Sequence, residues 1–221
     1  MDRRAAERVV RRRGWLADQD EPFRVEVLAA ARLVRMPPGG FLFHVADEPG
    51  GVYGLAAGGI GAHLPAADGE VRLADVLRPG TWFGYGPAVR GQRRSMAFSV
   101  IEESWLFSLP LSRVQEIARQ SPTHLRSVMA MSEYGMDVAM AALGTLLVRA
   151  TDKRVAATLL RVASDGQPVR LTQAQLGEMA NAERQVVNRV LKALAARGWL
   201  VAGYGQIEVT DRASLEGFVR G

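Results

Sequence analysis

The sequence predicts an α+β protein with an N-terminal antiparallel β-roll of the jelly-roll type, a long central helix and a C-terminal winged helix-turn-helix. Short β-type runs broken by Gly and Pro occupy residues 33–109, and helix-forming residues with few breakers occupy residues 111–150. A polar-faced helix pair followed by a Gly-rich hairpin occupies residues 172–209. With 221 residues and 48% hydrophobic content, the chain can bury the cores that these parts require.

The N-terminus is strongly basic. Residues 1–14 hold six arginines against two acidic residues, and they lack the apolar stretch of a secretory signal. We expect residues 1–20 to form a basic N-terminal arm that is solvated and disordered. The alternative is an arm that contacts nucleic-acid phosphate, in addition to any contact made by the polar-faced helix pair.

The roll is expected over residues 21–110. Short apolar runs recur there at the regular spacing of an antiparallel roll or barrel, separated by Pro and Gly clusters such as residues 37–40 and 49–51. The predicted strands are Phe41–His44, Val52–Ala56, Ile60–Leu64, Val71–Val76, Met96–Val100 and Trp105–Ser108.

Two helices are expected after the roll. Leu111–Arg119 forms a short one, and Pro122 in a first helical turn begins a second that runs to about Ala150. Small and apolar residues recur in the second at alternating steps of three and four, at positions 129, 132, 136, 139, 143, 146 and 150. This seam favours a homodimer interface, and packing against the chain's own roll is the alternative. A break at residues 151–153 predicts a hinge before the helix resumes at Arg154–Ala163.

Residues 172–200 predict two helices joined by a tight turn. Thr172 and Gln175 have the spacing of a capping box, and Gly177 permits close helix approach before an Asn181-Ala182 turn. In the second helix, polar and apolar residues separate onto opposite arcs at about 100° per residue. The apolar arc consists of Val186, Val187, Val190, Leu191 and Leu194, and the polar arc of Arg184, Gln185, Asn188 and Arg189.

A polar arc of this kind is typical of a recognition helix in the DNA major groove. Arginine is the commonest bidentate partner of guanine, and glutamine or asparagine can pair with adenine. The candidate base-reading residues are therefore Arg184, Gln185, Asn188 and Arg189. The candidate phosphate contacts are Thr172, Lys192 and Tyr204, the last on a predicted two-stranded wing that turns at residues 203–205. An ordinary amphipathic helix pair with a solvated charged face is the alternative.

Composition supports the nucleic-acid interpretation and excludes other classes. The net charge is +5, and residues 153–197 carry eight basic residues against three acidic ones. The absence of cysteine excludes disulfides, iron–sulfur clusters and cysteine-based zinc sites. No apolar run approaches the roughly 20 residues that cross a bilayer, so we expect a cytoplasmic protein without membrane contact. The common nucleotide-binding and nucleophile motifs are absent, and we expect no enzyme.

The order of roll, long helix and winged helix-turn-helix resembles the Crp/Fnr superfamily of bacterial transcription regulators. The similarity is most specific in Arg154–Leu160 (RVAATLL) and Thr172–Leu200, and it is visible in Leu77–Ser108. The domains that it implies are a cyclic-nucleotide-binding-like, effector-sensing roll at 21–110, a dimerisation region at 111–150 and a DNA-binding domain at 151–221. It also implies a homodimer on a palindromic double-stranded operator, with RNA polymerase as a further partner.

The resemblance also identifies a candidate effector pocket. The family's phosphate-binding cassette reads approximately Phe-Gly-Glu, a loop and Arg-Ser-Ala, where this chain has Phe83-Gly84-Tyr85 and Arg94-Ser95-Met96. Tyr85 thus replaces the acid that holds the ribose hydroxyl, whereas the phosphate-gripping pair Arg94-Ser95 is kept. The central-helix residues that contact adenine in cyclic-AMP-binding members fall at Ala139 and Met140.

Two of the three recognition elements are therefore missing, which implies a regulator that does not bind cyclic AMP tightly. We expect another small-molecule effector, anionic or apolar, or none, and no cofactor or metal. The three histidines, expected to be structural or surface residues, are His44, His63 and His124. Two alternatives remain open: a cyclic-nucleotide-responsive regulator that relies on Arg94-Ser95, and a ligand-independent dimeric DNA-binding protein. Gln185 replaces the Glu that often lies between the family's base-reading arginines, which implies an altered half-site.

Overall fold

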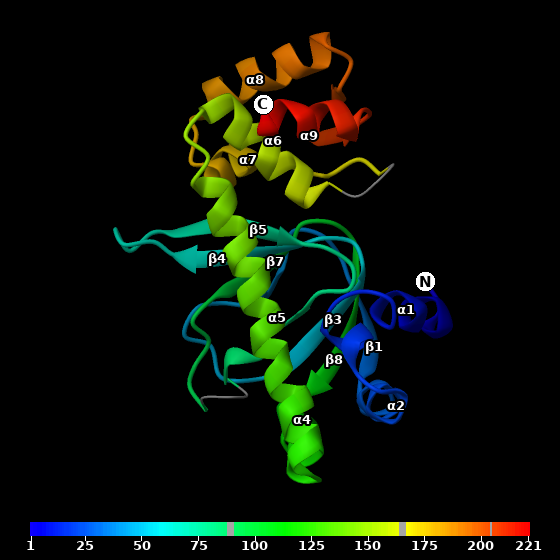
Figure 1. Ribbon diagram of the computed structural model, residues 1–221. Coiled ribbons are helices and arrows are strands. Elements are labelled where there is room, and N and C mark those ends of the chain that lie inside the picture. The colour runs from blue at the N-terminus through cyan, green and yellow to red at the C-terminus, as the bar shows by residue number, and fades with distance from the viewer. Residues whose placement is uncertain (88–90, 164–166, 204) are drawn as a thin grey trace. The chain divides into compact units, whose positions relative to one another are not determined.

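Two four-stranded sheets form the β-roll (Figure 1). The structure, a computed structural model, describes residues 1–87, 91–163, 167–203 and 205–221. One sheet has the strand order β1-β8-β3-β6 and the other β2-β7-β4-β5. The strands are β1 Arg32–Met36, β2 Phe41–Phe43, β3 Gly51–Ala57, β4 Ile60–Pro65, β5 Val71–Leu77, β6 Trp82–Phe83, β7 Ala97–Val100 and β8 Ser104–Pro110.

The predicted strands correspond to β2, β3, β4, β5, β7 and β8, with ends shifted by at most two residues. The predictions missed β1 and β6. In β1, Arg32 and Arg35 flank a single apolar pair, and β6 has only two residues. Both are edge strands of their sheet, where short or charged strands are common.

Alternating side chains of β3 and β8 serve two separate cores. Leu55 and Leu106 are buried between the sheets together with Phe98 of the second sheet. Val52 and Phe107 lie on the opposite face of the first sheet, where helices cover it. The first sheet is therefore buried on both faces, in agreement with the apolar composition of its central strands.

Two helices follow the roll. α4 (Leu111–Arg119) has the predicted bounds, and α5 (Pro122–Leu146) begins at the predicted proline but ends four residues before Ala150. One face of α5 packs on the roll, because Met131 is buried in the core between the first sheet and the helices. This face of α5 therefore packs against the chain's own roll, which was the alternative to a dimer interface.

The opposite stripe of α5 and the residue after it are apolar and exposed. The exposed fractions there reach 58% for Met136 and 73% for Leu147. The exposed apolar residues from the start of α5 to this point are Leu125, Met129, Met136, Met140, Leu143, Leu146 and Leu147. A stripe of this length has the spacing of a helix-packing seam, and nothing in the described part of the chain buries it.

The N-terminal segment is a packed helical layer. α1 (Arg3–Val10), the short 3-10 helix η1 (Trp15–Asp18) and α2 (Glu21–Ala30) cover the outer face of the first sheet (Figure 1). The expectation of a solvated, disordered arm is wrong, because Ala6 and Val10, four positions apart, bury one face of α1. Contact with phosphate stays a prediction for the exposed arginines of the segment, which are Arg3, Arg4, Arg8, Arg12 and Arg13.

Trp15 anchors this layer. Its side chain is 1% exposed, and its ring lies edge-on to Trp82 at 5.2 Å and to Phe23 at 5.8 Å between centroids. Its indole Nε1 donates to the backbone carbonyl of Ser127 on α5 at 2.6 Å. One residue thus joins the N-terminal segment to the sheet and to the long helix.

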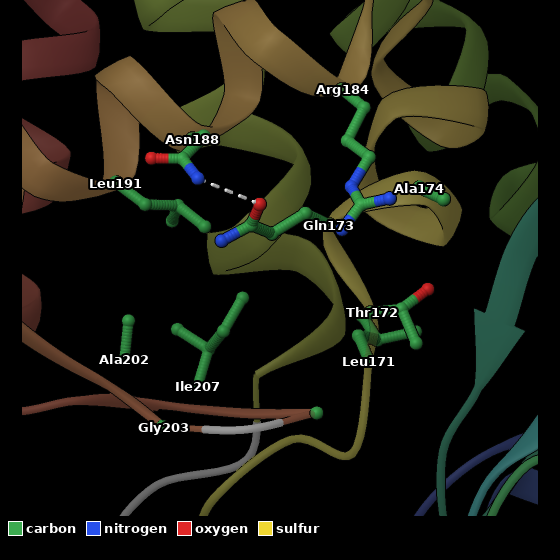
Figure 2. Close-up of a pocket in the computed structure, with 11 residues that line it drawn as sticks. Leu171, Thr172, Gln173, Ala174, Arg184, Asn188, Leu191, Ala202, Gly203 and Ile207 are labelled. Atoms are coloured by element: carbon green, nitrogen blue, oxygen red, sulfur yellow. Dashed lines mark hydrogen bonds between the residues drawn. The ribbon is translucent and has the colours of Figure 1, made fainter.

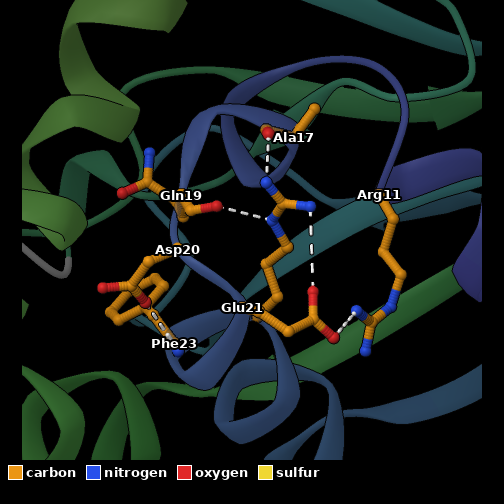
Figure 3. A network of polar contacts seen from close by, with 7 residues as sticks. Arg11, Ala17, Gln19, Asp20, Glu21 and Phe23 are labelled. Carbon is orange, nitrogen blue, oxygen red and sulfur yellow. Dashed lines mark hydrogen bonds and ion pairs between the residues drawn. The ribbon is translucent and has the colours of Figure 1, made fainter.

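Polar contacts fix the connection between η1 and α2 (Figure 3). Arg24 donates from Nε to the carbonyl of Gln19 at 2.6 Å and from Nη2 to that of Ala17 at 2.8 Å. The Glu21 carboxylate lies between Arg24 and Arg11 and pairs with both. The basic residues near the N-terminus are therefore partly used to satisfy backbone carbonyls and acidic side chains within the fold.

The rest of the chain consists of α6 (Thr151–Val162), α7 (Gln173–Ala180), α8 (Arg184–Ala196), β9 (Leu200–Gly203), β10 (Gln206–Val209) and α9 (Arg212–Arg220). The break before α6 lies at residues 147–150, earlier than the predicted 151–153. Two compact units result: Met1–Val71 with Val76–Val138, and Arg72–Asp75 with Ala139–Gly221. None of the helices in the described residues combines the length and apolarity needed to span a bilayer.

Candidate nucleic-acid interface and effector pocket

The first helix of the pair, α7, begins at the predicted capping box. The Thr172 hydroxyl accepts from the Gln175 backbone nitrogen at 3.1 Å, and the Gln175 side chain accepts from the Thr172 backbone nitrogen at 2.9 Å. These bonds satisfy two of the backbone N–H groups that a helix start leaves free. Thr172 itself is exposed at this end of α7, as a phosphate contact requires.

The turn between α7 and α8 is fixed by two residues. Asn181 adopts the left-handed conformation with φ +45°, and Ala182 donates its backbone N–H to the Gly177 carbonyl at 2.9 Å. A Cβ on Gly177 would lie 2.5 Å from the Ala182 carbonyl oxygen and 3.6 Å from the Val187 side chain. Glycine is therefore required mainly by the turn, and only secondarily by the helix approach that the sequence suggested.

The second helix, α8, separates its residues as predicted. Its buried residues are Val187, Val190, Leu191 and Leu194, whereas Val186 is half-buried. On the opposite face Arg184, Gln185 and Arg189 are exposed, and so is Lys192 one turn further on. Three of the four predicted base-reading side chains are thus free to meet a ligand.

Asn188 differs from the other three. It is half-buried, and its Nδ2 donates to Oε1 of Gln173, the first residue of α7, at 3.1 Å (Figure 2). This bond could not be predicted from local patterns, because it joins residues 15 positions apart on two helices.

The wing follows α8 directly. β9 and β10 pair antiparallel, with Gly203 opposite Gln206 and Leu200 opposite Val209. Val169 forms an isolated bridge with Ile207 through bonds of 2.7 Å and 2.9 Å, which ties the hairpin to the segment before α7. The predicted phosphate contact Tyr204 lies outside the described residues.

A hollow of about 480 Å³ lies between the start of α7, the recognition helix and the wing (Figure 2). Gln173, Arg184 and Asn188 contribute its polar groups, and Gly203 and Gly205 of the wing form its opposite wall. Glycines at this edge leave the backbone accessible, which suits close approach of a phosphodiester chain.

Arg154 stabilises the turn of the helix-turn-helix, a role that the sequence analysis did not predict. Its Nε donates to the Ala180 carbonyl at 2.6 Å, and Nη2 donates to the Asn181 carbonyl at 3.2 Å. Its Nη1 donates to the Val148 carbonyl at 2.8 Å. The guanidinium thus satisfies carbonyls that the end of α7 leaves without helical partners.

In the roll, the predicted phosphate-gripping residue Arg94 is 4% exposed and already bonded. Its Nη1 donates to the Gly84 carbonyl at 2.6 Å, and its Nη2 donates to the Gly51 carbonyl at 2.9 Å. The guanidinium lies 3.9 Å from the centre of the Phe43 ring. Burial lowers the pKa of Arg94.

Tyr85 reaches across to the long helix. Its hydroxyl lies so close to Gly135 of α5 that a Cβ on this glycine would be 1.5 Å from the phenol oxygen. Burial raises the pKa of Tyr85, so the hydroxyl is neutral and offers no carboxylate-like acceptor. Glycine at position 135 is what lets the ring fit against the helix.

The other predicted pocket residues differ in burial. Phe83 is buried in the inter-sheet core, stacked on Phe98 at 4.7 Å between centroids. Ser95 is exposed beside the buried Arg94. Ala139 and Met140 are exposed on α5.

The three histidines each contact neighbouring side chains of the fold. The imidazole of His63 bonds the Ser99 hydroxyl at 2.8 Å, that of His44 stacks on Phe41, and that of His124 lies between Ser121 and Glu26. Within the described ranges, His, Asp and Glu residues form no group of three or more that could hold a metal ion.

Comparisons with known proteins agree with this geometry. The family profile described as the cyclic nucleotide-binding domain matches residues 33–121, and that of the Crp-like helix-turn-helix domain matches residues 153–218. The cyclic AMP receptor protein of Thermus thermophilus is 28% identical over 182 residues, which cover 81% of this chain and 84% of that protein. The cAMP-activated global transcriptional regulator CRP of Escherichia coli is 21% identical, over 85% of this chain and 93% of its own.

Solved structures show the same fold. A putative cyclic nucleotide binding protein from Ruegeria pomeroyi superposes with a TM-score of 0.75 at 17% identity, over the whole length of both chains. FixK2 from Bradyrhizobium japonicum superposes with a TM-score of 0.71 at 20% identity, over 85% of this chain and 96% of its own.

Proposed function

Because the chain belongs to the Crp/Fnr superfamily of DNA-binding transcription regulators, we propose that it reads a palindromic operator as a homodimer. Its roll pocket, in this proposal, does not hold cyclic AMP tightly. The observation that carries the DNA-reading part is the exposed polar face of α8 beside the hollow and the wing. Such a regulator works where the chromosome is, so we expect it in the cytoplasm.

Each polar residue of α8 has a distinct task in this proposal. Arg184 and Arg189 each make a bidentate contact with guanine, because the planar guanidinium matches guanine O6 and N7. Gln185 and Asn188 read neighbouring bases. Thr172 at the start of α7 and Lys192 bind phosphate, and Tyr204 of the wing is proposed for the same task from the sequence alone.

The dimer is proposed to form through the exposed apolar stripe of α5. An unburied stripe with alternating steps of three and four is typical of helix pairs. Two-fold symmetry would then place two recognition helices about one turn of DNA, ~34 Å, apart. RNA polymerase is a further proposed partner, as for the superfamily generally.

For the effector pocket, the carrying observation is that Arg94 is already engaged. Its two terminal nitrogens already donate to the carbonyls of Gly84 and Gly51, so a cyclic phosphate would have to share the guanidinium with these bonds or displace them. A neutral Tyr85 stands where the ribose-holding acid would be, and the loss of such an acceptor weakens binding by on the order of a few kcal/mol. A different effector, or none, is therefore proposed.

One observation favours the alternative of a cyclic-nucleotide-responsive regulator. The Nε–H of Arg94 is buried and has no hydrogen-bond partner in the described part of the chain. An unpaired buried donor is costly, and a bound phosphate would satisfy it. The 28% identical relative from Thermus thermophilus is named a cyclic AMP receptor protein, which also favours this alternative.

Calorimetry with cyclic AMP tests the effector proposal. We expect no low-micromolar dissociation constant for the wild type. A low-micromolar constant that Arg94→Ala abolishes and Arg93→Ala leaves unchanged would overturn the proposal and establish the alternative. The neighbouring control is suitable because Arg93 is exposed and pairs with Glu48 at the surface.

The ligand-independent alternative needs a second measurement. Operator affinity is measured with the purified dimer in the presence and absence of a metabolite panel that includes cyclic AMP and cyclic GMP. Native mass spectrometry of the same preparation detects any small molecule that co-purifies. Unchanged affinity together with a bare protein mass would identify a regulator whose roll takes no effector.

A further inference from the structure

Asn188 differs from the other base-reading candidates because a hydrogen bond holds its side-chain amide in one orientation. In the described residues, the exposed side chains of Arg184, Gln185 and Arg189 make no hydrogen bond, whereas the Asn188 amide nitrogen donates to Gln173 at 3.1 Å. Figure 2 shows the Asn188 carbonyl oxygen pointing away from Gln173. One end of the amide is therefore engaged, and the other is left for a ligand.

The partner is itself held in place. Gln173 is the first residue of α7, directly after Thr172, whose capping box with Gln175 fixes this end of the helix. Gln173 is half-buried, and its oxygen faces Asn188 across the gap between α7 and α8 (Figure 2). The acceptor that orients Asn188 thus comes from the first residue of α7, where the capping box holds the backbone in place.

The orientation matters because an asparagine amide can present either a donor or an acceptor. A half-turn about its last bond exchanges the two, and the bases differ in which group they offer in the major groove. An outward oxygen accepts from the exocyclic amino group of adenine or cytosine. It meets another acceptor at guanine O6 or thymine O4, which is unfavourable.

We propose that Gln173 is a positioning residue for specificity, which holds Asn188 so that it selects adenine or cytosine, the bases whose exocyclic amino group faces the major groove. The second hydrogen on the Asn188 nitrogen remains available for adenine N7, which makes adenine the best partner. The inference rests on the proposed reading of bases by α8.

The test uses the full-length protein and selection from a randomised half-site library. Asn188→Ala first identifies the base pair whose preference it flattens. At that position of the contacted strand we expect the wild type to favour adenine or cytosine over guanine and thymine on the order of tenfold. Gln173→Met, which keeps the length and removes the amide, should reduce this ratio several-fold while the preferences at other pairs stay unchanged.

Gln173→Glu is the matched control. A carboxylate still accepts from the Asn188 nitrogen, so the preference should persist, while the added negative charge weakens binding to all sequences alike. In the Asn188→Ala background, Gln173→Met should have no further effect on the ratio. Circular dichroism and thermal unfolding confirm that each variant is folded.

Two results would overturn the inference, and a third would refute the proposed function. Gln173→Met could weaken binding to every sequence equally with the ratio intact, which would make Gln173 only a phosphate contact. Asn188→Ala could flatten no position, which would mean that Asn188 reads no base. A wild type without any sequence preference would instead refute the proposed function, and so the two failures are distinguishable.

Discussion

Gly135 lets Tyr85 pack against α5. A larger residue at this position would have two opposing effects on stability, a gain in helix propensity and a steric clash. A Cβ at this position would lie 1.5 Å from the phenol oxygen. Alanine is favoured over glycine inside a helix by about 1 kcal/mol, whereas forcing extra atoms into a filled site costs about 1–3 kcal/mol. The steric effect should win as long as the tyrosine ring stays in place.

We therefore expect Gly135→Ala to lower the free energy of unfolding in a urea titration. In the background of Tyr85→Ala, where the ring is gone, the same substitution should instead stabilise the protein through helix propensity. A Gly135→Ala protein that is more stable than the wild type would show that the ring does not occupy this contact.

Residue-level contacts of this kind depend on partners that are distant in sequence, which limits what the chain alone can reveal. The resemblance singles out Arg94 as the cassette arginine, but its bonds to the carbonyls of Gly84 and Gly51 depend on the folded roll. The same holds for Arg154 and for the bond between Gln173 and Asn188.

At the level of elements, local signals were sufficient wherever they were strong. Three signals predicted elements that the structure contains: the Thr172 capping box, Pro122 in the first turn of α5 and the regular spacing of short apolar runs in the roll. The N-terminal helices were missed because six arginines dominate residues 1–14, while the Ala6 and Val10 stripe is short. Asp20 as a cap with Pro22 following it was an available signal for α2.

The N-terminal segment should contribute strongly to stability because Trp15 is buried against two aromatic rings. We expect Trp15→Ala to cost about 3–5 kcal/mol of unfolding free energy, the usual loss for a buried large aromatic residue. Substitution of the exposed Arg12 by alanine is the control and should change stability little. A loss below 1 kcal/mol for Trp15→Ala would favour a dispensable arm.

The recognition helix α8 should separate into base-reading and phosphate-binding residues. We expect Arg184→Ala and Arg189→Ala each to cost about 1–3 kcal/mol and to relax preference at one base pair. Lys192→Ala should weaken binding to all sequences and flatten the dependence of affinity on salt. Selections with Arg184→Ala that return the unaltered consensus would contradict the assignment.

At the level of the whole molecule, assembly should depend on the exposed stripe of α5. Leu143→Arg would place a charge in the middle of the proposed interface, where burial without a partner is costly. We expect this variant to sediment as a monomer at low micromolar concentration, and the exposed Asp137→Arg to remain a dimer. Sedimentation velocity distinguishes the two species, and a fully dimeric Leu143→Arg protein would exclude this interface.

The bonds of Arg154 connect the end of α5 to the helix-turn-helix. Its guanidinium bonds the carbonyl of Val148, just after α5, and the carbonyls of Ala180 and Asn181 at the α7–α8 turn. Three carbonyls along the chain thus bond one planar group, and we expect these bonds to stiffen the link at 147–150. A small rotation at the end of α5 would then rotate the recognition helix α8 as well, and so change the angle at which it meets DNA.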